Sequence, residues 1–266
     1  MPRPICLLTD FGHRDPFVGV MKCVIAAIAP SARVIDLVHD LPPHDVRAGA
    51  FALKSALRWL PPRAIVVGVV DPGVGTARRP IAIDTARATF VGPDNGLFTH
   101  ALEEGAEVRL LRDRRFFLEE VSSTFHGRDV FAPVAAHLAR GVAVARLGPR
   151  VPDPVRLPLS EPRRDARGVH GEIVTIDRYG NAITNVPNEW VAPAAKVRVR
   201  RRSMTTAAAY GAVPAGAPVA VPSSGGTLEI AIHGGDAREE LGLSVGDAVV
   251  VVQSSVRRPS STRGWR

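Results

Sequence analysis

The residues best suited to chemistry lie just after an apolar run. Residues 64–70 have the length and composition of a buried strand, and Asp71 follows that strand directly. A proline and two glycines occupy three of the next four positions, so the chain turns sharply where it leaves the sheet. Arg78 comes seven residues after Asp71. A carboxylate and a guanidinium on one Gly-rich loop at a strand end indicate a ligand site, with an ordinary strand-exit turn as the alternative.

His126 lies in a second polar cluster, residues 122–129, which leads into an apolar helix predicted over 130–140. Taken singly, Asp71, Arg78 and His126 each have a structural explanation, as a turn residue, a surface cation and a neighbour of a helix cap. Each of them, however, lies in a Gly-containing polar cluster at the edge of a predicted element. Catalytic groups gather on loops of this kind, so these three residues form the candidate catalytic set.

The sequence argues against several other kinds of site. Histidines and aspartates are present in number, but no pair of histidines has HExxH spacing and no CxxC occurs. There is no GxSxG motif for a serine nucleophile and no GxGxxG motif for a dinucleotide. We therefore expect neither a metal site nor a standard NAD site.

A third group of polar residues lies within residues 176–185. Asp177, Tyr179 and Asn181 surround a glycine there. An asparagine offers a paired donor and acceptor to a purine edge, and a tyrosine offers a stacking face. These features indicate nucleoside binding, and an ordinary hairpin turn is the alternative.

The elements that must position these residues follow two patterns. In the first half, predicted strands alternate with predicted helices: strands over 5–9, 33–38, 64–70, 81–84 and 89–91, and helices over 16–29, 45–60 and 97–104. This rhythm favours a mostly parallel, doubly wound sheet. In the second half, short strands are separated by Gly-rich turns, over 169–176, 182–186, 196–202, 218–221, 227–232 and 248–253. They predict a small antiparallel barrel or sandwich.

The fold class is therefore α/β, with two domains. We expect an N-terminal α/β domain over 1–147, a linker rich in proline and arginine over 148–167, and a C-terminal β-barrel domain over 168–254. Residues 255–266 form a basic tail that we expect to be disordered.

Composition narrows the class of protein further. The 266 residues carry 34 Lys and Arg against 26 Asp and Glu, a net charge of +8, and 45% are hydrophobic, which suffices for a core. The basic excess lies late in the chain and no nucleic-acid-binding motif accompanies it, so we expect a solvated surface and no nucleic acid partner. Cys6 and Cys23 are the only cysteines. With no signal-peptide pattern and no apolar run of membrane-spanning length, this predicts a cytoplasmic protein that does not bind membranes.

Together these stretches resemble the S-adenosyl-L-methionine (SAM) hydrolase family, also called the SAM hydroxide adenosyltransferases, which is related to the fluorinase and chlorinase enzymes. The matching segments run from the first predicted strand almost to the tail: residues 9–12, 15–22, 34–39, 71–79, 93–97, 124–129, 177–185 and 226–231.

The resemblance implies hydrolysis of SAM to adenosine and L-methionine, by nucleophilic substitution of water or hydroxide at C5′. SAM is then the substrate, and neither a cofactor nor a metal is expected. The resemblance also implies a Rossmann-like N-terminal domain and a C-terminal β-barrel. It further implies a homotrimer whose active sites lie between the N-terminal domain of one subunit and the C-terminal domain of a neighbour.

The resemblance also assigns roles by motif position. The family's catalytic triad falls on Asp71, Arg78 and His126. Substrate binding falls on Asp10 for the ribose, Tyr179 and Asn181 for adenine, Asp177 for the methionine amino group, and Ser224 for the rest of the methionine.

Two positions separate hydrolysis from halide transfer. The halogenases are expected to carry a halide-binding serine at the position of Gly127 and a tyrosine at that of Asp71, so hydrolysis is the stronger interpretation. A SAM-dependent halogenase remains one alternative, and a SAM- or nucleoside-binding regulator without turnover is another.

Overall fold

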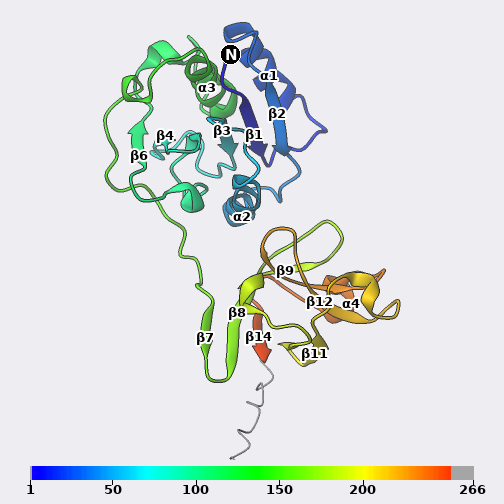
Figure 1. Ribbon diagram of the computed structural model, residues 1–266. Coiled ribbons are helices and arrows are strands. Elements are labelled where there is room, and N and C mark those ends of the chain that lie inside the picture. Colours follow the sequence, from blue (N-terminus) through cyan, green and yellow to red (C-terminus); the bar gives the residue numbers. More distant parts are fainter. Residues whose placement is uncertain (1, 253–266) are drawn as a thin grey trace, which may run out of the picture. The chain divides into compact units, whose positions relative to one another are not determined.

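The computed structural model describes residues 2–252, which form two compact units that divide between Pro158 and Leu159 (Figure 1). The boundary falls inside the segment 148–167 that the sequence predicts as a linker. The basic tail predicted over 255–266 lies outside the described residues.

Both ends of the predicted linker are built into the units. Val151 donates its backbone N–H to the carbonyl of Val108 at 2.9 Å, beside an edge strand of the first unit. Arg163–Asp165 forms strand β7, which pairs with a strand of the second unit. The composition of this segment predicts irregular structure, but a strand of each unit takes up its backbone hydrogen-bonding groups.

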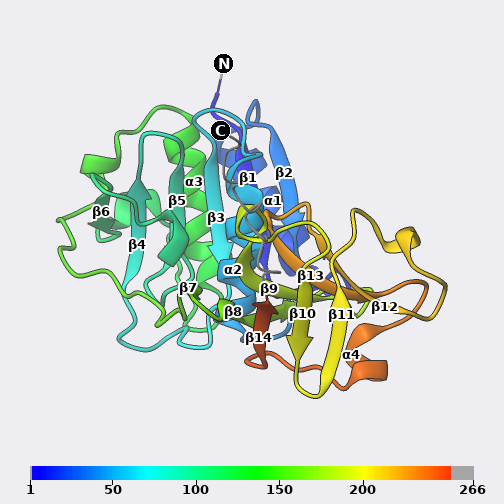
Figure 2. The ribbon, with the colours of Figure 1, turned by 60° about the horizontal axis from the view of Figure 1, so that its bottom comes forward.

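The first unit contains a six-stranded sheet with the order β2-β1-β3-β5-β4-β6 (Figure 2). Its strands are β1 (Ile5–Thr9), β2 (Val34–Val38), β3 (Ile65–Val69), β4 (Pro80–Asp84), β5 (Thr89–Pro93) and β6 (Glu107–Leu110). Three pairings are parallel, β1 with β2, β1 with β3 and β3 with β5, and only β4 runs antiparallel to its neighbours. The reversal follows from the short connection 85–88, because a parallel pair needs a longer crossover. The mostly parallel sheet is thus confirmed.

Helices cover both faces of this sheet. Helices α1 (Phe17–Ile28) and α3 (Ala132–Ala139) pack on one face, and α2 (Val46–Leu57) packs on the other. Along β1, Ile5 and Leu7 pack in the core on the face covered by α1 and α3. Cys6 and Leu8 pack in the core on the face covered by α2, as strand alternation requires. The doubly wound arrangement is therefore confirmed. In residues 2–252 no helix combines the length and the apolar character needed to cross a membrane.

The helix predicted over 97–104 is wrong. Only Thr99–Ala101 forms a turn of 3₁₀ helix. The side chain of Asn95 accepts the N–H of Leu97 at 3.2 Å, and the Thr99 hydroxyl donates to the carbonyl of Gly96 at 2.7 Å. Such short-range side-chain bonds compete with the helical backbone bonds and limit the helix.

The second unit is a nearly closed antiparallel barrel, which confirms the predicted barrel. Its strand order is β11-β10-β14-β8-β9-β13-β12, and a bridge between Thr206 and Ala220 joins the two ends of that order. The elements after β7 are β8 (Gly168–Ile176), β9 (Ala182–Pro187), β10 (Lys196–Val199), β11 (Arg202–Thr205), β12 (Pro218–Pro222), β13 (Thr227–Ile232), helix α4 (Ala237–Leu241) and β14 (Ala248–Val252).

The strand predicted over 196–202 is instead a hairpin of β10 and β11. Its turn includes Arg200, which has a positive φ of 51°. The turn contains neither glycine nor proline, so the sequence carried no turn signal there.

A close approach between two loops brings distant candidate residues together. Gly75, in the loop between β3 and β4, has a φ of +76°, and a Cβ there would lie 2.4 Å from the carbonyl oxygen of Ser123. No side chain fits at that distance, so glycine is what allows loop 71–79 to contact residues 122–126.

We predict that Gly75→Ala destabilises the protein more than Gly105→Ala does. Gly105 also has a positive φ, of 82°, but a Cβ there meets nothing within 4 Å, so its substitution measures only the backbone cost of about 1–2 kcal/mol. The overlap with Ser123 adds to that cost at Gly75. Urea unfolding of both variants measures the difference, and equal losses would contradict the close approach.

Candidate active site

The candidate residues lie at the topological switch point of the first unit's sheet. From β1 the chain crosses to β2 on one side and then to β3 on the other, which leaves a crevice beyond the carboxyl ends of β1 and β3. Thr9 and Val69 are paired at the ends of these two strands. Asp10 and Asp71 follow within two residues, so both carboxylates lie at the same edge of the sheet.

Arg78 turns back from its loop to pair with Asp71. Its Nε donates to Asp71 Oδ1 at 3.1 Å and its Nη2 donates to Oδ2, which makes the pair bidentate. The two side chains are only 7% and 6% exposed. The guanidinium also lies over the ring of Phe131, 5.5 Å from the centroid. The structure therefore brings these two candidate residues together and holds the cation on two sides.

His126 joins this pair from a distant part of the chain. Its Nδ1 lies 3.1 Å from Nη2 of Arg78. Because a guanidinium only donates, Nδ1 must accept, and the neutral ring carries its proton on Nε2. Burial and the charge of Arg78 lower the pKa of His126, while Asp71 and Asp129 offset part of that shift. The imidazole is therefore neutral at pH 7.

A π-helical turn follows His126 directly. Residues Gly127–Phe131 form this turn, which continues into α3, and π-turns are frequent at functional sites. The buried carboxylate of Asp129 accepts the backbone N–H of Ser122 at 2.9 Å and pairs with Arg128. These contacts connect the two ends of the polar cluster, residues 122–129, that contains His126.

A cavity of about 280 Å³ opens beside these groups. Its lining includes Asp10, Asp71, His126 and three phenylalanines, Phe11, Phe17 and Phe125. The three rings contact one another with centroids 5.2 to 5.7 Å apart. An aromatic wall with a few convergent polar groups is typical of a site for a small molecule.

One buried donor at this site has no hydrogen-bond partner among the described residues. It is Nη1 of Arg78. An unmatched buried N–H is costly, so a ligand oxygen that accepted from Nη1 would remove that cost. A fixed cation, a carboxylate and a neutral imidazole together can bind a water molecule and favour its deprotonation.

The other candidate binding residues lie in the second unit. Asp177, Tyr179 and Asn181 share the turn between β8 and β9, where Asp177 Oδ1 accepts the N–H of Tyr179 at 2.8 Å and that of Asn181 at 2.9 Å. Its Oδ2 accepts from Asn181 Nδ2 at 3.0 Å. The turn leaves Tyr179 76% exposed, so its ring is free to stack. Ser224 lies in the connection between β12 and β13.

The second unit also contains a buried acid, Glu229, that was not among the candidate residues. Glu229 is 5% exposed and accepts the hydroxyl of Tyr210 at 2.5 Å. Burial raises the pKa of Glu229, the bond from Tyr210 opposes that shift, and the charge of Asp177 adds to it. Burial and Glu229 raise the pKa of Tyr210 to about 12. These acidic groups, Asp177 and Glu229, favour a cationic group of a ligand. In the sequence, the feature that could have marked Glu229 is that it is the only acid in an otherwise mostly apolar strand, residues 227–232.

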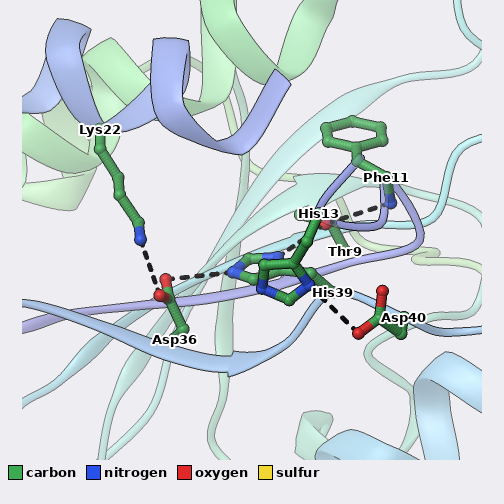
Figure 3. Close-up of polar contacts among 7 residues, drawn as sticks. All are labelled: Thr9, Phe11, His13, Lys22, Asp36, His39 and Asp40. Atoms are coloured by element: carbon green, nitrogen blue, oxygen red, sulfur yellow. Dashed lines mark hydrogen bonds and ion pairs between the residues drawn. The ribbon is translucent and has the colours of Figure 1, made fainter. Parts of the chain in front are cut away.

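No group of three or more His, Cys, Asp or Glu side chains between residues 2 and 252 is arranged to hold a metal ion. His39 is instead buried between Thr9 and Asp36 (Figure 3).

The carboxylate of Asp10 is bound by a backbone group. The backbone N–H of His44 donates to Asp10 Oδ2 at 2.8 Å. This hydrogen bond to Asp10 could not be predicted from the sequence, because the donor is a backbone N–H and not a particular type of side chain.

Comparison with known proteins supports a single family. The chain matches the SAM hydroxide adenosyltransferase N-terminal domain over residues 5–148 and the SAM hydroxide adenosyltransferase C-terminal domain over residues 171–250. An (R)-S-adenosyl-L-methionine hydrolase from Thermus thermophilus is 48% identical over 255 residues, which cover 92% of this chain and 97% of that protein. Another from Salinispora tropica is 41% identical over 257 residues, covering 94% and 98%.

A solved structure agrees with these sequence matches. An uncharacterized conserved protein from Thermotoga maritima superposes with a TM-score of 0.88 at 39% identity, covering 94% of this chain and 100% of that one. Both domains of the family are thus matched in order along one chain, and relatives above 40% identity match over nearly their whole length. This protein therefore belongs to the SAM hydroxide adenosyltransferase family.

Proposed function

We propose that this chain hydrolyses SAM to adenosine and L-methionine. The observation that carries the proposal is the convergence of Asp71, Arg78 and His126 beside a cavity lined with aromatic rings. The relatives named as hydrolases of SAM supply the substrate. In the reaction, the oxygen of water or hydroxide forms a bond to C5′ as the C5′–S bond breaks. The sulfur keeps the electron pair and leaves as the neutral thioether of methionine.

The leaving group decides what the residues must supply. A sulfonium leaves as a neutral thioether, so no general acid is needed, and the difficulty is the weak nucleophile. The charge of Arg78 favours hydroxide over water, but Arg78 itself cannot be the base because a guanidinium stays protonated in proteins. The neutral His126, with its proton on Nε2, donates to the nucleophile oxygen. Asp71 is then the acceptor for the proton that water loses.

We assign the binding roles to the remaining candidates. Asp10 binds the ribose hydroxyls, and Tyr179 and Asn181 bind adenine. Asp177 binds the methionine ammonium, and its position near buried Glu229 strengthens that preference for a cation. Ser224 contacts the rest of the methionine. Holding C5′ in line with the nucleophile contributes roughly 7–11 kcal/mol of the barrier reduction.

The proposal includes an assembly and a location. The enzyme forms a homotrimer, with each active site shared by the N-terminal domain of one subunit and the C-terminal domain of the next, and it uses neither metal nor cofactor. This part rests on the family resemblance. Its free cysteines, Cys6 and Cys23, suit the cytoplasm.

Halide transfer is the weaker alternative. A Cβ at Gly127 would lie 3.2 to 3.3 Å from side-chain atoms of Phe125, Met21 and Phe11. The serine expected of a halogenase would therefore crowd the cavity wall. A binding protein without turnover is distinguished by whether adenosine and methionine are released.

We predict that Asp71→Asn and Arg78→Lys each lower the release of adenosine by at least about 100-fold, because each breaks the bidentate pair that holds the nucleophile. Chromatography of SAM reactions measures both products, with a chelator present throughout to test metal independence. Asp113→Asn and Arg115→Lys are matched controls, because they break a similar pair far out on the surface. Full turnover in both active-site variants would remove the catalytic assignment.

We predict that the acid limb of kcat/KM against pH lies below pH 6.5. The lowered pKa of His126 keeps the ring neutral at pH 6.5, so activity falls only as pH drops through that lower value. His126→Asn, which can still accept from Arg78, should lose the part of this limb that arises from the imidazole. A limb above pH 6.5, or one whose position is unchanged in His126→Asn, would contradict the proposed role.

We predict that two defective variants complement each other. Asp71→Asn removes a catalytic residue of the first unit. Tyr179→Ala, in the second unit, should raise KM by about tenfold because stacking on the base is lost. It should not lower stability, because the ring is exposed. In mixed trimers formed by co-expression, one site in three then joins two intact halves. Activity at low SAM concentration should exceed that of either variant alone. No gain would place the whole site within one chain and refute the shared site.

A further inference from the structure

The segment that follows β2 holds the turn that carries Asp10. The backbone N–H of Gly12 donates to the carbonyl of His39 at 2.8 Å. The Nδ1 of His39 lies 2.8 Å from the hydroxyl of Thr9, and that hydroxyl also accepts the N–H of Phe11 at 3.3 Å. The residues on both sides of Asp10 are therefore tied, directly or through Thr9, to one histidine (Figure 3).

The neighbours of the His39 imidazole determine which of its two ring nitrogens carries the proton. The ring is fully buried, and its Nε2 lies 3.1 Å from Asp36 Oδ1, at ion-pair distance although poorly aligned for a hydrogen bond. A carboxylate only accepts, so Nε2 carries a proton. In the neutral ring Nδ1 is then an acceptor for the Thr9 hydroxyl, whose lone pairs remain available to the N–H of Phe11. Every contact of Thr9 is satisfied by this single tautomer.

The far end of this chain of contacts reaches α1. Asp36 Oδ2 accepts from Lys22 Nζ at 2.6 Å, and the two side chains are 40% and 39% exposed. Figure 3 shows the resulting line of side chains, from Lys22 on α1 through Asp36 and His39 to Thr9 at the end of β1. The contacts thus anchor the turn to a helix and to two strands.

The same segment also reaches the carboxylate of Asp10. His44 has a φ of +65°, which a non-glycine residue rarely adopts, and its N–H donates to Asp10 Oδ2. Strain of this kind is retained at sites where the surrounding structure needs the conformation. Both Asp10 and His44 line the cavity.

We propose that His39 is a positioning residue. Its ring, through Thr9, and its carbonyl, through Gly12, fix the turn that aims the Asp10 carboxylate into the cavity. His39 does not line that cavity, so it acts through Asp10 and not on the ligand. The inference rests on the proposed function, in which Asp10 binds the ribose.

The test removes the contact from the Thr9 side, where the volume changes least. Thr9→Val loses the hydroxyl that joins His39 to Phe11, and Thr9→Ser keeps it as the conservative rescue. Hydrogen exchange of the peptide that contains residues 9–12 reports the turn itself, without any need for turnover. KM and kcat for SAM report its effect on the ligand.

We expect faster exchange at residues 9–12 and a KM raised about tenfold in Thr9→Val, with kcat changed less and both restored in Thr9→Ser. His13→Asn is the control, because its ring packs 5.3 Å from that of His39 and pairs only with exposed Asp40. It should leave both measurements at the wild-type level. On an Asp10→Asn background, Thr9→Val should add little to KM, because its effect passes through Asp10.

Three results would overturn the proposal. Unchanged exchange in Thr9→Val would show that the imidazole does not hold the turn. Faster exchange with an unchanged KM, or full additivity with Asp10→Asn, would show that the turn does not position Asp10. A wild-type protein that releases no adenosine would instead refute the proposed function, and the exchange measurement would still decide whether His39 holds the turn.

Discussion

A buried guanidinium is the constraint on which the candidate active site depends. Arg78 is almost fully enclosed, and a charge removed from water must be paired and hydrogen-bonded to be tolerated. Asp71 neutralises it through two bonds, Phe131 covers one face, and His126 accepts at a third position. Burial and the same cation lower the pKa of the imidazole, and the N–H of the cation fixes which ring nitrogen accepts.

The backbone makes this arrangement possible. The sheet order places the ends of β1 and β3 side by side at a switch point, which brings Asp10 and Asp71 to one edge. Gly75 then allows the loop of Arg78 to approach the cluster of His126 more closely than any side chain permits. The cavity is therefore a product of strand order and one glycine as much as of its polar residues.

The second unit contributes a different kind of chemistry. In its turn between β8 and β9, Asp177 accepts local N–H groups that fix the turn, and Tyr179 is exposed. Buried Glu229 lies close enough to Asp177 that the charge of Asp177 adds to the effect of burial in raising the pKa of Glu229. This combination of an exposed ring and concentrated acid suits a substrate that has both an aromatic base and positive charge, as SAM does.

The sequence by itself determined the local elements, because the alternation of apolar and polar residues and the turn residues act over a few positions. The strand ending before Asp71, the doubly wound pattern and the barrel strands could all be predicted. It also marked the candidate residues, because their polar clusters break apolar runs. Only the tertiary structure decided that Arg78 meets His126, that His39 is buried behind Asp10, and that a backbone N–H of His44 orients that carboxylate. These contacts join residues some 30 to 48 positions apart, and the order of strands in the sheet, which no local pattern encodes, brings them together.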